Sequence, residues 1–135
     1  MELLVVLGIL GLVLALAVPS LGRSLPGLQL QTDARTVAGA LREARMLAIG
    51  GNRETRLVVD VEQRTLQLGE GVVRLNPQLG ISLLTAASEA PAAETGGISF
   101  FPDGTSTGGR VTLSLGERQR HVVVDWLTGK VSVVE

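Results

Sequence analysis

The feature that most constrains this chain is an apolar run near its N-terminus. Residues 3–18 (LLVVLGILGLVLALAV) contain no polar side chain, and the first charge after them is Arg23. A helix over the roughly 20 uncharged residues 3–22 would be about 30 Å long, close to the hydrocarbon thickness of a bilayer. In lipid only a helix satisfies the backbone polar groups of such a segment. The run therefore predicts a transmembrane helix over residues 1–22.

A cleaved secretory signal is the main alternative for this segment. Ala15-Leu16-Ala17 resembles a small-residue cleavage site, but Glu2 stands where a signal peptide carries positive charge. A core helix of a soluble protein fits less well, because the run has no polar face. The Glu2 carboxylate is open to two interpretations. It is either paired with a positive group of a companion molecule or solvated at the helix N-terminus, where the helix dipole favours it.

A second helical pattern follows a proline. Residues 22–27 (GRSLPG) contain Pro26, which removes a backbone donor, so we expect a kink or short break there. An amphipathic helix is then predicted from about Gln29 to Ile49, with Gly50-Gly51 as a left-handed stop. Its apolar stripe consists of Leu30, Ala34, Val37, Leu41, Ala44 and Ala48. We expect the stripe to pack on a sheet and the arginines beside it to be solvated on the outer face, with contacts to neighbouring subunits as the alternative.

From Thr55 the pattern changes from helix to short strands. The predicted strands cover residues 56–61, 65–68, 71–75, 81–85, 98–101, 110–115, 120–126 and 130–134. The segment 86–97 (AASEAPAAETGG) fits a loop, and Pro102-Asp103-Gly104 and Thr128-Gly129 are turn signals. Runs of strands after a helix indicate an antiparallel α+β domain. We expect this domain over residues 52–135, after a linker and the amphipathic helix over residues 23–51.

Groups suited to catalysis or metal binding are sparse. The chain has 13 acidic and 12 basic residues, three aromatic residues and no cysteine, which argues against a polyanionic partner, a base-stacking platform and Cys-ligated zinc. His121 is the only histidine, and a lone strand histidine is more often a surface or interface residue than a base. Asp103 and Asp125 could form a carboxylate pair, but turns explain both. We therefore expect no catalytic activity, metal site or cofactor.

Three N-terminal residues carry a resemblance to a known family. Glu2, Gly11 and Pro19 stand at the spacing found in type IV pilins and type II secretion pseudopilins. The resemblance implies that they serve subunit assembly, with Glu2 offsetting the N-terminal amine of an adjacent subunit. The family's basic leader and methylated phenylalanine are absent, and the chain opens a few residues late. We expect an internal or trimmed start, with prepilin peptidase as a partner if a leader is encoded upstream.

A second resemblance covers most of the remaining chain. Residues 40–68 and 98–133 are similar to the H-type minor pseudopilin of type II secretion, the GspH family. That family has an FxPDG loop, a Thr/Ser-Gly-Gly turn and a D-W-x-T-G hairpin. The matching signature residues are Phe101, Asp103, Gly104, Gly108, Gly109, Asp125 and Gly129. The resemblance implies a long N-terminal helix, transmembrane and then amphipathic, packed on an antiparallel β-sandwich-like domain.

The function implied by this resemblance is structural. It is that of a minor pseudopilin in the periplasmic pseudopilus of type II secretion, with the major pseudopilin and other minor pseudopilins as partners. The protein would be a single-pass protein of the bacterial inner membrane, with its C-terminal domain in the periplasm. The alternative is a minor type IV pilin of the FimT kind, involved in pilus assembly or DNA uptake. Arg118, Arg120 and Lys130 could gather for DNA binding, but Glu117 and Asp125 lie among them, so nucleic acid is not the expected partner.

Overall fold

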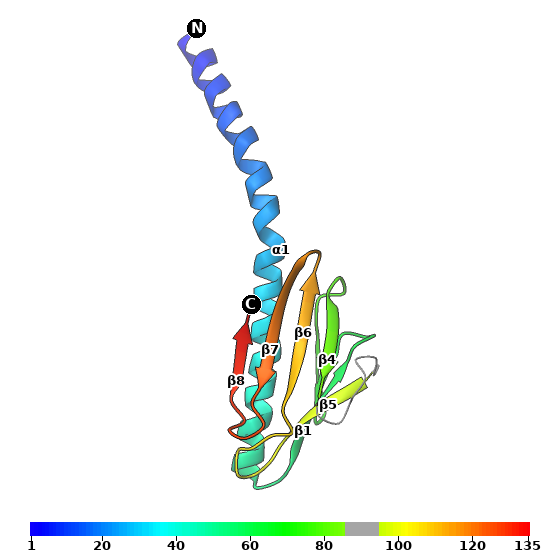
Figure 1. The fold of residues 1–135 in the computed structure, drawn as a ribbon. Helices are drawn as coiled ribbons and strands as arrows, with labels where there is room; N and C mark the ends of the chain where they lie inside the picture. Colours follow the sequence, from blue (N-terminus) through cyan, green and yellow to red (C-terminus); the bar gives the residue numbers. More distant parts are fainter. Residues whose placement is uncertain (86–94) are drawn as a thin grey trace.

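A computed structural model of the chain describes residues 1–85 and 95–135, with the backbone alone described over residues 17–26. Figure 1 shows a long helix, α1, whose N-terminal half projects beyond a β domain packed along its C-terminal half. The helix spans Glu2–Gly51, and strands make up most of the described chain after it. These strands are β1 (Thr55–Asp60), β2 (Thr65–Leu68), β3 (Gly71–Arg74), β4 (Gly80–Leu84), β5 (Thr95–Phe100), β6 (Gly109–Leu115), β7 (Arg118–Val124) and β8 (Val131–Val134).

The helix is one element rather than two. Its backbone stays helical through residues 22–27, so the predicted short break is wrong. A proline has a φ close to the helical value and costs about 3 kcal/mol inside a helix, which long helical flanks on both sides can offset. The predicted stop is also displaced, because Gly50 and Gly51 are still helical and Asn52 takes the left-handed conformation, with φ 49°. Asparagine tolerates this conformation better than most residues, and its N–H bonds to the Ala48 carbonyl.

The strands form two antiparallel sheets, with the orders β3-β2-β1-β5 and β4-β6-β7-β8. Each predicted strand is present, with ends that differ by a few residues. Residues 95–97, predicted as loop, belong to β5 and pair with β1. Asp125 and Trp126, predicted as the end of a strand, lie instead in the connection between β7 and β8. The rest of the predicted loop, residues 86–94, lies outside the described residues.

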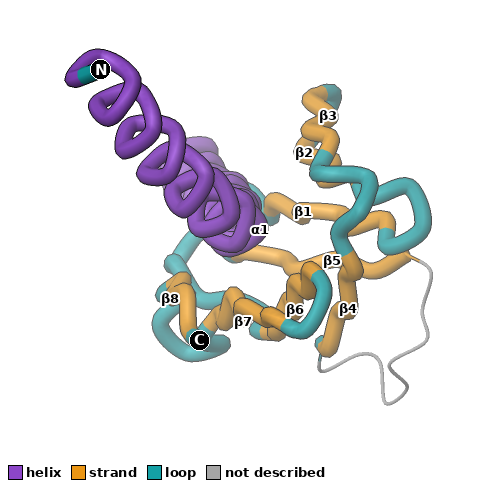
Figure 2. The backbone as a smooth tube through the Cα atoms, turned by 90° about the horizontal axis from the view of Figure 1, so that it is seen from above, coloured by secondary structure: helices purple, strands orange, loops and turns teal. Residues whose placement is uncertain are grey.

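The core lies where α1 meets both sheets. All six residues of the predicted helical stripe are at most 1% exposed, so their role as core residues is confirmed. They join buried side chains from both sheets, including Leu57, Phe100 and Leu113. Figure 2 shows α1 lying over the two sheets, with β1 of one sheet and β7 and β8 of the other beside it. The predicted α+β class, a helix packed on an antiparallel sandwich-like domain, is therefore confirmed.

Candidate assembly interface

The N-terminal half of α1 has no cover within the described chain. Large apolar side chains are exposed from Leu3, at 80%, to Leu16, at 71%. They surround the helix on all sides and do not form one stripe. Soluble monomers rarely expose a contiguous apolar surface of this extent. This half of the helix is therefore a candidate surface for contact with other molecules.

The predicted assembly residues lie along this exposed half. Glu2 occupies the first helical turn, next to the N-cap residue Met1, and its side chain is exposed. Around Gly11 no atom outside the local helix backbone lies within 4 Å of the place that a Cβ would take. Pro19 falls outside the residues with described side chains. Where side chains are described, no helical stretch combines the length and the hydropathy needed to cross a membrane.

The signature loop is built around an aspartate turn. Thr105 donates two hydrogen bonds to Asp103 Oδ1, from its Oγ1 at 2.6 Å and from its backbone nitrogen at 3.0 Å. These bonds, the hydroxyl's most of all, hold the pKa of the Asp103 carboxyl below its usual range. The N–H of Gly104 donates to the Phe101 carbonyl, and Gly104 has φ 89°. A glycine is therefore required where the turn closes.

A second aspartate turn closes the hairpin between β7 and β8. Asp125 Oδ1 accepts hydrogen bonds from the backbone N–H groups of Thr128 at 3.0 Å and Leu127 at 2.8 Å. These bonds, that of Thr128 first, lower the pKa of the Asp125 carboxyl. Gly129 follows with φ 68° and donates its N–H to the Asp125 carbonyl at 2.8 Å. The carboxylates of Asp103 and Asp125 thus each hold their own turn, as the sequence indicates.

Arg45 on α1 joins the two turns. Its Nε donates to the Gly104 carbonyl at 3.2 Å, and its Nη2 donates to the Thr128 carbonyl at 3.1 Å. Gly129 lies directly against the Gly104 carbonyl and the Arg45 side chain, because a Cβ at this position would overlap both of them. The guanidinium therefore ties the loop, the hairpin and the helix together at one end of the domain.

The expectation that the helix arginines are solvated on the outer face is wrong for Arg45, and Arg42, although exposed, also bonds to the β domain. Arg45 makes the two bonds described above, and the Arg42 Nη2 donates to the Val131 carbonyl of β8 at 3.2 Å. The acceptors are backbone carbonyls, which every residue type carries. No pattern in the sequence could therefore have marked these contacts.

The glycine pair completes the same end of the domain. A Cβ on Gly108 would lie 3.0 Å from the Cβ of Trp126, and one on Gly109 would lie 3.0 Å from the Leu84 carbonyl. The structure thus gathers the seven signature residues, which we call the signature end: Phe101, Asp103, Gly104, Gly108, Gly109, Asp125 and Gly129. They build turns fastened by close backbone contacts, whereas reactive groups do not converge there. On the surface of this end, Trp126 and Leu127 are 65% and 60% exposed.

The lone histidine is partnered within its sheet. His121 Nδ1 shares a hydrogen bond with Thr112 Oγ1, 2.9 Å away on β6. Among the residues that the structure describes, no three metal-ligating side chains come together.

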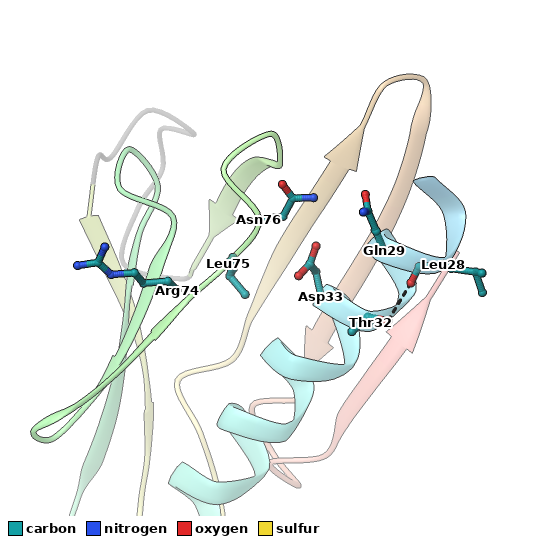
Figure 3. A pocket seen from close by; sticks show the side chains of 7 residues that line it. All are labelled: Leu28, Gln29, Thr32, Asp33, Arg74, Leu75 and Asn76. Atoms are coloured by element: carbon teal, nitrogen blue, oxygen red, sulfur yellow. Dashed lines mark hydrogen bonds between the residues drawn. The ribbon is translucent and has the colours of Figure 1, made fainter. Parts of the chain in front are cut away.

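A cleft that the sequence does not indicate lies between α1 and the segment after β3. Figure 3 shows Gln29 and Asp33 on the helix side, facing Asn76. The cleft measures about 520 Å³. Burial raises the pKa of the Asp33 carboxyl, and a hydrogen bond from the Asn76 backbone opposes the shift. Helical spacing gave no signal for it, because the cleft forms only where residues 74–76 come to lie across from the helix.

Comparison with known proteins identifies the family. Residues 33–129 match the family described as type II transport protein GspH. Over 132 residues the chain is 31% identical to type II secretion system protein H of Xanthomonas campestris pv. campestris, covering 97% of this chain and 78% of that protein. The chain belongs to the GspH family. The GspH match includes Arg45 and the whole signature end.

Solved structures support the fold. The chain is similar to the minor pseudopilin EpsH of Vibrio cholerae, with a TM-score of 0.61 and 13% identity over 78% of this chain and 95% of that one. It is also similar to the type IV minor pilin FimU of Pseudomonas aeruginosa, with a TM-score of 0.58 and 15% identity over 78% of this chain and 88% of that one. GspH membership makes this protein a minor pseudopilin of type II secretion, a structural component of that system.

Proposed function

We propose that residues 1–22 anchor this GspH-family protein in the bacterial inner membrane by a single pass, with the β domain in the periplasm. The observation that supports the anchor is the exposed apolar surface from Leu3 to Leu16, which surrounds the helix. Each leucine or valine side chain gains about 1.5–3 kcal/mol on leaving water. Lipid supplies an apolar environment for these side chains before assembly, and the helices of other subunits supply it afterwards.

The partners in this proposal are the major pseudopilin and the other minor pseudopilins. Prepilin peptidase joins them if a leader is encoded upstream. The exposed half of the helix packs in the filament, and the β domain remains outside it to select neighbours. Turns fastened by backbone contacts at the signature end support a rigid structural subunit.

Glu2 sets the register of packing in this proposal. An unpaired carboxylate at a membrane helix costs up to about 3 kcal/mol when it lies deep. The N-terminal amine of an adjacent subunit removes that cost, and only one axial offset between two helices brings the groups together. Gly11 supports the same packing, because a residue without a Cβ lets a neighbouring helix approach closely.

The test compares Glu2→Ala with Glu62→Ala, a matched loss of an exposed acid in the connection after β1. Both full-length variants are expressed in a host that lacks the parent protein. Subunit cross-linking measures incorporation into filaments, and membrane fractionation measures anchoring. We expect Glu2→Ala to lose incorporation while both variants stay in the membrane. Parental incorporation of Glu2→Ala would contradict the pairing role, and recovery of both variants in the soluble fraction would contradict the anchor.

DNA binding by a FimT-like minor pilin is the second candidate. It is favoured by three arginines, Arg35, Arg42 and Arg120, that line one groove. Against it, Arg120 is already in an ion pair with Glu135, at 3.1 Å. Fluorescence polarisation of labelled DNA with the full-length chain in detergent distinguishes DNA binding from the structural role proposed above. A tight complex that weakens steeply with salt would favour DNA binding.

A further inference from the structure

A groove of about 390 Å³ runs between α1 and the outer strand β8. Arg35 and Arg42 line it from the helix, Arg120 lines it from β7, and Val133 and Glu135 line its β8 side. β8 is the terminal strand in the order β4-β6-β7-β8, and neither Figure 1 nor Figure 2 shows a strand beyond it. The groove therefore combines a sheet edge with a basic helix flank.

The phase of the β7–β8 ladder determines which backbone groups face the groove. Asp125 N–H donates to the Lys130 carbonyl at 3.0 Å, so these two residues form a hydrogen-bonded pair. The pairs Val124–Val131 and Val122–Val133 lie one and three positions further along the same ladder and are therefore of the other kind. Hydrogen-bonded and non-hydrogen-bonded pairs alternate in an antiparallel ladder. Val131 and Val133 thus direct their backbone groups away from β7. The bond from Arg42 to the Val131 carbonyl agrees with this phase.

The charge of the groove is one-sided. Arg35 and Arg42 stand two helical turns apart on α1, about 10 Å along its axis. Arg120 adds a third guanidinium, whereas Glu135 is the only acidic residue among the groove's lining residues. The Glu135 side chain is 84% exposed and bonds to Arg120 at 3.1 Å. Two guanidiniums therefore lack a carboxylate partner within this lining.

We infer that the β8 edge accepts an extended acidic segment of a partner protein as an added strand. The segment pairs with the outward backbone groups of Val131 and Val133, and carboxylates at alternate positions reach Arg35 and Arg42. In the free chain Arg42 covers the Val131 carbonyl, which protects part of the edge. On binding, Arg42 turns to a carboxylate and releases this carbonyl for strand pairing. The inference goes beyond the proposed function, because it does not depend on the membrane helix.

The binding test uses the full-length chain in non-ionic detergent. The probe is a fluorescent peptide in which glutamate and valine alternate, and one control peptide has lysine in place of glutamate. A second control peptide keeps every side chain but carries N-methyl groups on alternate backbone nitrogens, which blocks strand pairing. We expect each control peptide to bind at least about tenfold more weakly than the acidic probe. Failure of the acidic probe to bind would overturn the inference.

Three variants locate the site. Val133→Pro removes an outward N–H, a change that an edge strand tolerates. We expect it to weaken binding of the acidic probe about tenfold without changing the melting temperature of the protein. Arg35→Glu is expected to weaken it at least as much, whereas Arg74→Glu on β3 of the other sheet is the matched control and should have no effect. If Val133→Pro impairs folding, binding of the N-methylated peptide to the unaltered chain tests strand pairing in its place. Equal binding of the methylated and parent peptides would show attraction of acids without strand pairing and overturn the inference.

Discussion

The two halves of α1 are one continuous helix with two different surfaces. Residues 3–16 are apolar on every side and exposed, whereas residues 30–48 are apolar along one stripe, which is buried. The backbone is helical in both halves. The halves differ in their side-chain pattern and in whether the β domain covers them. The β domain of the same chain covers the second half, whereas no part of the described chain covers the first. In the proposed function, domain stability and assembly are therefore assigned to different residues of one helix.

A pair of leucine truncations tests this division most strongly. Leu41→Ala empties a fully buried position in the covered half, and we expect a loss of about 2–5 kcal/mol in the free energy of unfolding. Leu10→Ala removes the same atoms from a side chain that is 54% exposed, and we expect a change within about 0.5 kcal/mol. Chemical denaturation in detergent, followed by circular dichroism, measures both. Equal losses would contradict the separation of the two halves.

The signature end fastens the covered half to the hairpin, and Gly129 tests that contact. Gly129→Ala combines a left-handed backbone, φ 68°, with an overlap on the Gly104 carbonyl and Arg45. We expect a loss of about 3 kcal/mol in the free energy of unfolding, measured by chemical denaturation. Gly116 has φ 63°, but no atom lies within 4 Å of the place that its Cβ would take, so it isolates the backbone contribution. Gly116→Ala should cost only about 1–2 kcal/mol, and similar losses for both would show that the overlap is absent.

The Arg45 contacts are expected to contribute less. Arg45→Ala removes two charge-assisted bonds to the Gly104 and Thr128 carbonyls, and we expect a loss of about 1.5–3 kcal/mol in the free energy of unfolding. Arg35→Ala is the matched control, because Arg35 is exposed on the same helix. Thermal melts of both variants measure the difference. Because alanine is a better helix former than arginine, helix propensity does not predict a loss for either variant. A loss for Arg35→Ala as large as that for Arg45→Ala would mean that removal of any arginine from this helix, and not the loss of the joined turns, explains the effect.

The fold could be predicted where side chains repeat with a period. The stripe from Leu30 to Ala48 was predicted apart from Ala38, which is also buried, because spacings of three and four residues mark one face of a helix. The strands were predicted from alternation and turn residues. The continuity of the helix through Pro26 was not predicted. The helix propensity of one proline is a local property, whereas the stability of a long helix also depends on the residues that flank the proline.

The candidate site was less predictable for a different reason. Arg42 and Arg45 bond to carbonyl groups, and the Asp33 cleft depends on where residues 74–76 come to rest. Neither leaves a trace in residue type or spacing. The assembly roles of Glu2, Gly11 and Pro19 remain predictions, because they concern contacts with other molecules.

The smallest expected effect concerns Asp33, a polar residue within the covered half. Burial raises the pKa of its carboxyl in the folded chain above the usual value of 3.8. The folded state therefore holds this proton more tightly than the unfolded state does. The resulting stability is fully present below the unfolded pKa and is lost as the pH rises through the raised folded pKa. At neutral pH the charged Asp33 carboxylate thus contributes less stability than its protonated form would.

Asp33→Asn tests this sign with a neutral side chain of nearly the same shape. We expect the variant to melt slightly higher than the parent at neutral pH and no higher at about pH 3, where the parent carboxyl is itself largely protonated. Asp125→Asn is the control of opposite sign, because its turn lowers the carboxyl pKa and the stability it contributes is lost only as the pH falls. If Asp33→Asn melted lower than the parent at neutral pH, the carboxylate would be stabilising in place, which requires a positive partner in the cleft. The covered half would then be held by an ion pair as well as by its apolar stripe.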